Sequence, residues 1–254
     1  MEHTALIAYE DTPQGHDGVA LGRLLCEAIE ARPLLATILP WPPGFVGPED
    51  LDAAVAADIG THFDAGTGML AGLDPRTRAS VDQSVGQGLI ELARAEDARL
   101  LVFGSCHRGA VGRTLLGSTV ESVLHDVAAA VAVAPLGYSE RAREAPARIA
   151  IAYDSSPESE AALETATGLA RAWGAAVTLL GVADYPRYDY AEAWTVLSGG
   201  GMHDFEREAR HRALRDGLAR VKERGPGTMR LLTGSPGPML AGVSGEFDLL
   251  VAGS

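Results

Sequence analysis

Lysine is almost missing from this sequence: Lys222 is the only one among 21 basic residues, and the others are arginines. A P-loop nucleotide site needs a lysine directly after its glycine-rich turn, and no glycine of this chain is followed by one. Glu10 and Asp11 resemble the acidic pair of a phosphate-accepting receiver domain, but that family relies on a lysine near its last strand, and the first half has none. Neither class of protein is therefore supported.

Cysteine is nearly as scarce, with Cys26 in an apolar helical run and Cys106 in a glycine-rich loop. Two cysteines without metal-ligand spacing predict free thiols in a reducing compartment rather than a disulfide framework. Long apolar runs are missing as well, since none approaches the ~20 residues that span a membrane. The start of the chain also lacks the basic region of a signal peptide. We therefore expect a soluble, cytoplasmic protein with no membrane partner.

Positive charge is outweighed by negative charge, and the formal net charge is −13. Such a chain gains nothing from nucleic-acid phosphates, so no nucleic-acid partner is expected. The seven histidines are scattered, and no metal site is predicted. A dinucleotide fingerprint is absent after the first apolar run. His16 and Asp17 with Ser118 would be a hydrolase set only beside a Gly-x-Ser-x-Gly elbow, which does not occur, so no catalytic residue is assigned.

What the chain does contain is an internal repeat. Thr4–Pro13 (TALIAYEDTP) has a counterpart in Arg148–Pro157 (RIAIAYDSSP), with an offset of 144 residues. Each copy predicts a short buried strand, then a carboxylate, then a Ser/Thr-Pro helix start. Asp97–Ser105 and Glu246–Ser254 match with an offset of 149, so the second half has five additional residues in between.

Helical periodicity alternates with short apolar runs in both halves. The predicted helices include Leu21–Ile29, Leu89–Ala95, Ala162–Ala170 and Met239–Val243, and the predicted strands include Leu34–Leu39 and Ala176–Val182. This alternation predicts an α/β fold with parallel, doubly wound sheets.

We place the two domains at residues 1–138 and 148–254, joined by a charged linker at 139–147. Irregular segments run from Trp41 to about Leu73 and from Tyr185 to Gly201. In this fold such connections pass over the carboxyl ends of the strands, where ligands bind.

One glycine-rich loop follows the predicted strand Leu100–Phe103 and begins at Gly104. Glycines let backbone amides approach an anion closely, and the later Gly117–Thr119 opens a helix whose N-terminal amides suit a phosphate. Arg108 and Arg113 would add positive charge nearby. By itself the loop is equally compatible with phosphate binding and with a plain tight connection.

The spacing of this loop resembles the universal stress protein signature, in which Gly-x-x-Gly is followed nine residues later by Gly and then Ser or Thr. Gly104 and Gly117 are thirteen apart, and Ser118 follows. The strand Val131–Pro135 and the Tyr-carboxylate-x-Ser/Thr-Pro element of both halves also look like that family. The resemblance covers nearly the whole chain. It implies two tandem universal-stress-protein-like domains of the adenine nucleotide alpha hydrolase-like, Rossmann type, each with a five-stranded parallel sheet flanked by helices.

For function, the resemblance implies a stress-response or signalling protein that binds ATP or a related adenine nucleotide in its first domain, with Mg²⁺ allowed and slow hydrolysis at most. The base is expected near Glu10 and Ile38, and the phosphates near Gly104 and Gly117–Thr119. The residues expected to bind nucleotide are Tyr9, Glu10, Ile38, Phe103, Gly104, His107, Arg108, Gly109, Gly117, Ser118 and Thr119. The two halves are expected to form an intramolecular pseudo-dimer or to assemble as a homodimer, with Val131–Pro135 at an interface.

The chain departs from the family pattern in three places. The first is His107 at the second glycine position of the signature, where it is either a loop residue or a phosphate contact. The second is Glu10, which replaces the aspartate usual at the end of the first strand; Asp154 in the second half has the usual residue type. The second half stops at Gly253 and Ser254, before its own phosphate-binding helix and last strand. We therefore expect the second domain to lack a family-type phosphate site and to be less stable, and we expect the natural protein to be longer.

A second function is compatible with the same family resemblance. Some universal stress proteins bind no nucleotide and act as dimerising interaction modules. An open loop between Gly104 and Ser118 favours nucleotide binding, whereas a blocked loop is compatible with the interaction module.

Overall fold

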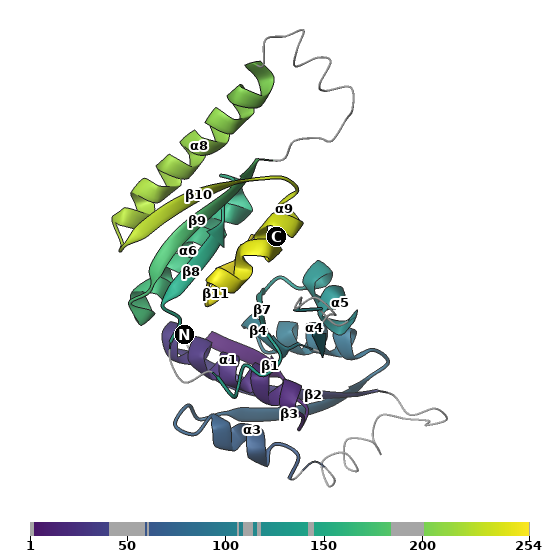
Figure 1. Ribbon diagram of the computed structural model, residues 1–254. Helices are drawn as coiled ribbons and strands as arrows, with labels where there is room; N and C mark the ends of the chain where they lie inside the picture. Colours follow the sequence, from purple (N-terminus) through teal and green to yellow (C-terminus); the bar gives the residue numbers. More distant parts are fainter. Residues whose placement is uncertain are drawn as a thin grey trace. The chain divides into compact units, whose positions relative to one another are not determined.

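The computed structural model describes residues 3–40, 59, 61–105, 107–108, 114–115, 118–141, 145–183 and 201–253, with only the backbone described at 107–108, 114–115, 118 and 201–206. It divides into two compact units, Met1–Glu144 and Ala145–Ser254 (Figure 1). The division falls inside the predicted linker. The segments predicted to pass over the strand ends lie largely outside the described residues, which resume at 59 and at 201.

The first unit is built on a five-stranded sheet in the order β3–β2–β1–β4–β7, and every neighbouring pair is parallel. Its strands are β1 (His3–Ala8), β2 (Ala31–Pro40), β3 (Arg76–Asp82), β4 (Ala98–Gly104) and β7 (Ala130–Ala134). Ile7 of the central strand is opposite Leu35 on one side and Val102 on the other. The prediction of a parallel α/β sheet is therefore confirmed.

Helices cover both faces of this sheet: α1 (Pro13–Ile29), α3 (Asp64–Met69), α4 (Val85–Ala95) and α5 (Ser118–Asp126). Right-handed crossovers place α1 and α3 on one face and α4 and α5 on the other, and each pair is in contact. Alternate side chains of β1 then serve different cores: Leu6 packs with residues of α4 and α5, whereas Ile7 lies against Gly22 of α1.

The second unit has a four-stranded parallel sheet in the order β10–β9–β8–β11. Its elements are β8 (Arg148–Ala152), α6 (Pro157–Trp173), β9 (Ala176–Ala183), α8 (Gly201–Lys222), β10 (Gly227–Thr233), α9 (Pro236–Val243), a short 3₁₀ turn (Ser244–Glu246) and β11 (Leu249–Val251). Among the described residues, this order repeats that of β3–β2–β1–β4 in the first unit.

The repeat extends to the helix ends. Thr12 caps α1 by accepting the N–H of Gly15 at 3.1 Å, and Ser156 caps α6 by accepting the N–H of Ser159 at 3.2 Å. Both helices end on a left-handed residue 144 positions apart, Glu30 (φ 54°) and Gly174 (φ 68°). The two strand–turn–helix modules are therefore the same structure in different residues.

No helix within the described ranges is both long and apolar enough to cross a membrane. Among the same residues, no three histidine, cysteine or carboxylate side chains are grouped as a metal site would require.

Candidate functional site

The strands of the first sheet end side by side at one edge, and three predicted nucleotide-binding residues are fixed there by the core. The Tyr9 N–H donates to the Ala36 carbonyl at 2.8 Å, and the Thr37 hydroxyl donates to the Tyr9 carbonyl at 2.7 Å. The side chains of Tyr9, Ile38 and Phe103 are all buried. These three side chains therefore form a buried floor beneath the edge, and they do not extend into solvent toward a ligand.

Glu10 differs from these three because its side chain is exposed. It follows β1 directly, and its carbonyl would lie 1.9 Å from a Cβ atom placed on Gly15. The backbone of Glu10 is thus held against the first turn of α1 while its carboxylate faces solvent. It is an exposed carboxylate at the point where the first strand ends.

Polar and aromatic residues that sequence reasoning had not assigned to the site surround Tyr9. Its hydroxyl donates to Asp11 at 3.4 Å, and Asp11 also bonds His16 Nε2 at 2.9 Å. The Tyr9 ring lies against His62 and Phe63, with centroids 5.5 and 5.9 Å away. Burial, and next the charge of Asp11, raise the pKa of Tyr9, so this hydroxyl stays a donor at neutral pH.

Gly104 ends β4 at a point where the backbone comes unusually close to α1. A Cβ atom there would lie 1.8 Å from the Gln14 carbonyl oxygen, and one on Gly18 would lie 2.9 Å from the Gly104 nitrogen. The next residue, Ser105, donates its N–H to Ala134 at 2.9 Å. Glycine is therefore required at 104 by packing, whatever the loop binds.

The loop that begins there contains a small hairpin that the sequence did not predict. β5 (His107–Arg108) pairs antiparallel with β6 (Thr114–Leu115), with His107 opposite Leu115. The backbone at His107 is thus extended and does not need the left-handed conformation that glycine favours. Gly109 and Gly117 lie outside the described residues, and the side chains of His107, Arg108 and Ser118 are not described.

Helix α5 begins at Ser118, and Thr119 in its first turn is half-buried. In a parallel sheet the helix after a strand starts at the strand's carboxyl end, so the N-terminus of α5 and Gly104 share one edge. A helix N-terminus offers free N–H groups and a positive dipole end. The same edge therefore has two features: a helix N-terminus that suits an anion, and the exposed Glu10 carboxylate, which can accept hydrogen bonds from hydroxyl or amine groups.

Asp17 is excluded from the site by its contacts. Its carboxylate is 1% exposed and accepts from the N–H groups of Gly137 and Ser139 and from the Ser139 hydroxyl, each at 2.7 Å. It holds the segment after β7 against α1 and takes no part in a hydrolase set.

A family model described as the universal stress protein family matches residues 35–135 and 147–254. The chain belongs to this family. The two matches also agree with a tandem, two-domain form.

Two solved universal stress proteins share the tandem architecture over most of the chain. One from Archaeoglobus fulgidus aligns with 96% of this chain and 83% of its own length, at 14% identity and a TM-score of 0.64. One from Pseudomonas aeruginosa aligns with 92% and 75%, at 14% identity and a TM-score of 0.54. An Archaeoglobus fulgidus protein solved with dAMP aligns with 53% of this chain and 98% of its own, at 13% identity and a TM-score of 0.38. A search of curated protein sequences finds no significant match.

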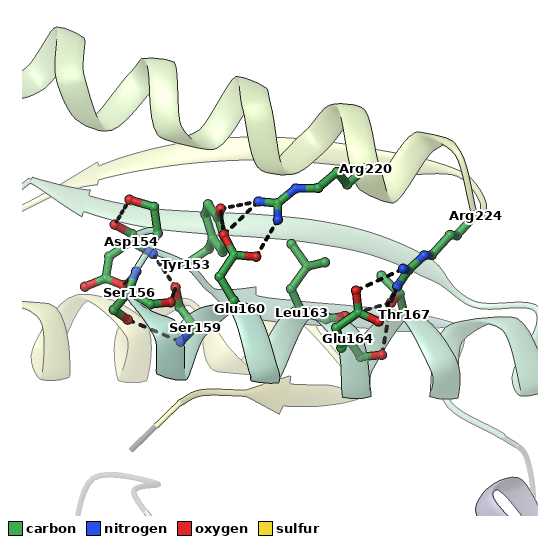
Figure 2. Close-up of polar contacts among 11 residues, drawn as sticks. Tyr153, Asp154, Ser156, Ser159, Glu160, Leu163, Glu164, Thr167, Arg220 and Arg224 are labelled. Atoms are coloured by element: carbon green, nitrogen blue, oxygen red, sulfur yellow. Dashed lines mark hydrogen bonds and ion pairs between the residues drawn. The ribbon is translucent and has the colours of Figure 1, made fainter.

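The second unit of this universal stress protein carries a different set of groups around its equivalent tyrosine. The Tyr153 hydroxyl donates to Glu160 at 2.7 Å, and Arg220 of α8 donates to both carboxylate oxygens of Glu160, as Figure 2 shows. Burial raises the pKa of Tyr153 to about 12, with the Glu160 hydrogen bond as the next cause. The hydrogen bonds from Arg220 and then from Tyr153 lower the pKa of Glu160. Position 160 corresponds to His16 in the first unit.

Asp154, which keeps the family's usual residue type, is engaged in its own turn (Figure 2). Its carboxylate accepts the Ser156 N–H at 2.9 Å, and its N–H donates to the Ser159 hydroxyl at 3.4 Å. Hydrogen bonds from Ser156 are the main cause that lowers the Asp154 pKa. Between them Ser155 is left-handed, with φ 66°. The carboxylate therefore stabilises the β8–α6 turn.

A glycine faces the tyrosine ring in both units. A Cβ atom on Gly66 of α3 would lie 2.8 Å from the Tyr9 ring, and one on Gly217 of α8 would lie 2.8 Å from the Tyr153 ring. The close approach of β4 to α1 is likewise repeated, since a Cβ atom on Gly253 would lie 2.3 Å from the Glu158 backbone. Gly66 and Gly217 are not related by the 144-residue offset of the two tyrosines, because the segments between tyrosine and glycine differ in length. Comparing the halves at that offset therefore misses this pair of glycines.

Proposed function

We propose that the first unit of this universal stress protein binds ATP or a related adenine nucleotide, and that the protein signals stress or growth state in the cytoplasm rather than catalysing rapid turnover. Family membership supports the ligand class, and the carboxyl edge of the first sheet supports the location. The observation that carries the proposal is that the exposed Glu10, the glycine end of β4 and the N-terminus of α5 share this edge.

In this proposal the phosphates lie at the N-terminus of α5, near Gly104, Gly117, Ser118 and Thr119, where helix amides favour negative charge. The ribose and base lie toward Glu10 and over the floor made by Tyr9, Ile38 and Phe103. His107 and Arg108 with Gly109 belong to the loop beside the phosphates. If Mg²⁺ accompanies the phosphates, it supplies further positive charge to them.

The test compares two equivalent positions in the same protein. Glu10→Ala should weaken ATP binding, measured by calorimetry, by about tenfold through loss of one or two hydrogen bonds to the ribose or base. Asp154→Ala changes the equivalent carboxylate of the second unit and should leave the affinity unchanged. Equal losses in both variants would exclude the first-unit edge as the site.

A third variant tests the loop. Gly117→Leu places a bulky side chain where the phosphates are proposed to lie and should abolish binding without unfolding the sheet. Unchanged affinity in this variant would remove the loop from the mechanism. Phosphate release from bound ATP should remain slow in every variant.

The alternative is a dimerising interaction module that binds no nucleotide. One observation favours it: β5 and β6 pair with each other, so this part of the loop is held by its own backbone pairing. The calorimetric experiment with the unmodified protein separates the two functions.

A further inference from the structure

Helix α8 of the second unit differs from its counterpart α3 in length and charge. It has 22 residues against six, and α3 contains no arginine. In a chain with a net charge of −13, α8 carries a basic excess, with six arginine and lysine residues against four acidic ones. Figure 1 shows α8 running alongside β10.

A groove with a volume of about 660 Å³ lies between α8 and β10. Arg207, His211 and Arg215 are four residues apart and therefore follow one another along the same side of the helix. The described residues that line the groove are Arg207, Glu208, His211, Leu214, Arg215, Met229 and Leu231. Among these described residues, an apolar floor lies beside a wall that carries two arginines and, at Glu208, one carboxylate.

Both arginines of this wall are exposed. Arg210, Arg220, Arg224 and Arg230 of this unit each pair with a carboxylate. Within the part of the chain that the structure describes, neither Arg207 nor Arg215 has such a partner. Because no described carboxylate pairs with them, their charge can attract an acidic ligand.

The strand under this wall is an edge strand, since β10 has only β9 beside it in the described sheet. The Pro226 carbonyl accepts the Val177 N–H at 3.1 Å, and the Gly234 N–H donates to Ala183 at 3.0 Å. Because alternate residues of a strand face the same neighbour, the intervening Gly227, Met229, Leu231 and Thr233 turn their N–H and C=O groups outward. Met229 and Leu231 are the same residues whose side chains line the groove.

We propose that the β10 edge and the α8 groove bind an extended acidic segment of a partner protein by strand addition. The segment's backbone pairs with Met229 and Leu231, which is how edge strands recognise peptides. Every second side chain then faces α8, where carboxylates meet Arg207 and Arg215. Seven residues of β10 set the length of the bound segment at about seven. This site lies in the second unit and does not depend on the proposed nucleotide site.

The probe is a fluorescein-labelled, end-blocked octapeptide of alternating glutamate and valine, titrated with the full chain and followed by anisotropy. The acidic peptide should bind at least about tenfold more tightly than its lysine-valine counterpart, and added salt should weaken binding. Methylation of alternate backbone nitrogens should also weaken binding at least about tenfold, because it removes the strand hydrogen bonds. Equal binding of the methylated peptide would overturn strand addition.

Two charge-matched double variants locate the site. Arg207→Glu with Arg215→Glu should weaken peptide binding at least about tenfold. Arg171→Glu with Arg212→Glu changes the same charge at exposed positions outside the groove and should have little effect. Equal losses of peptide affinity in both double variants would show that only the net charge of the protein matters, and would overturn the proposal. Absence of peptide binding, with self-association that only the first pair abolishes, would make a second copy of the chain the occupant and overturn it as well.

Discussion

Arg220 donates two hydrogen bonds to Glu160, at 2.5 and 2.8 Å, and so ties the end of α8 to the first turns of α6. The same guanidinium also donates to the Tyr153 hydroxyl. The first unit has no equivalent clamp among its described residues, because position 16 is a histidine paired with Asp11.

This ion pair makes the free energy of unfolding of the second unit depend on pH in the acidic range. The folded-state pKa of Glu160 is lowered, so its stabilisation is present above the unfolded value of about 4.3 and is lost as the pH falls through the folded value. Glu160→Gln should cost less than about 1 kcal/mol at pH 7, since both side chains are partly exposed, and the difference should shrink below about pH 4. Urea unfolding at both pH values measures this. Glu158→Gln is the control, and a constant difference across pH would contradict the account.

Gly104 is required by packing and not by loop flexibility. Gly104→Ala drives a methyl group into the Gln14 carbonyl and should destabilise the first unit by about 3 kcal/mol. Gly68→Ala is the control, because a Cβ atom on Gly68 meets nothing within 4 Å and alanine favours the helix by about 0.5–1 kcal/mol. Thermal unfolding of both variants gives the comparison. If the two variants are equally stable, the close approach of β4 to α1 does not require glycine at position 104.

The edge strand β7 provides a prediction about assembly. Ser105 donates to the Ala134 carbonyl, so alternate residues of β7 face β4 and the N–H of Val133 points outward. If this edge pairs across a dimer, Val133→Pro should dissociate the dimer in sedimentation experiments without breaking the sheet. Ala132→Pro, which removes an inward hydrogen bond, should instead unfold the unit. A dimer that survives Val133→Pro uses another surface.

The two units should also differ in local stability. Leu101 and Val102 of β4 are 0% exposed, whereas their counterparts Leu250 and Val251 of β11 are only half-buried. Less apolar burial lowers the free energy of opening. In hydrogen exchange, amides of β8 and β9 should therefore exchange at least about tenfold faster than those of β1 and β4. Equal protection would mean that another chain completes the second sheet.

Much of the fold could be predicted because the repeat encodes it locally. The Tyr-carboxylate-x-Ser/Thr-Pro element specifies a strand end and a helix cap in ten residues, and the structure reproduces it at Thr12 and Ser156. By contrast, β3 and β10 are missing from the sequence prediction. Both strands contain exposed residues, such as Thr77 and Arg230, and therefore lack a continuous apolar run.

The site was harder to predict than the fold because its side chains come from distant segments. Asp11, His16 and His62 meet around Tyr9, although no spacing rule joins them. Asp17 was considered for a hydrolase set, yet its carboxylate accepts hydrogen bonds from Gly137 and Ser139, 120 and 122 residues away. Such pairings depend on how helices pack and leave no local pattern in the sequence.

The most direct test of the central claim is to denature the purified, unmodified protein and analyse the supernatant by chromatography. The account predicts an adenine nucleotide, close to one per chain because only the first unit is proposed to bind it. A supernatant without nucleotide, together with no calorimetric binding of ATP at millimolar concentration, would contradict nucleotide binding and favour the interaction module.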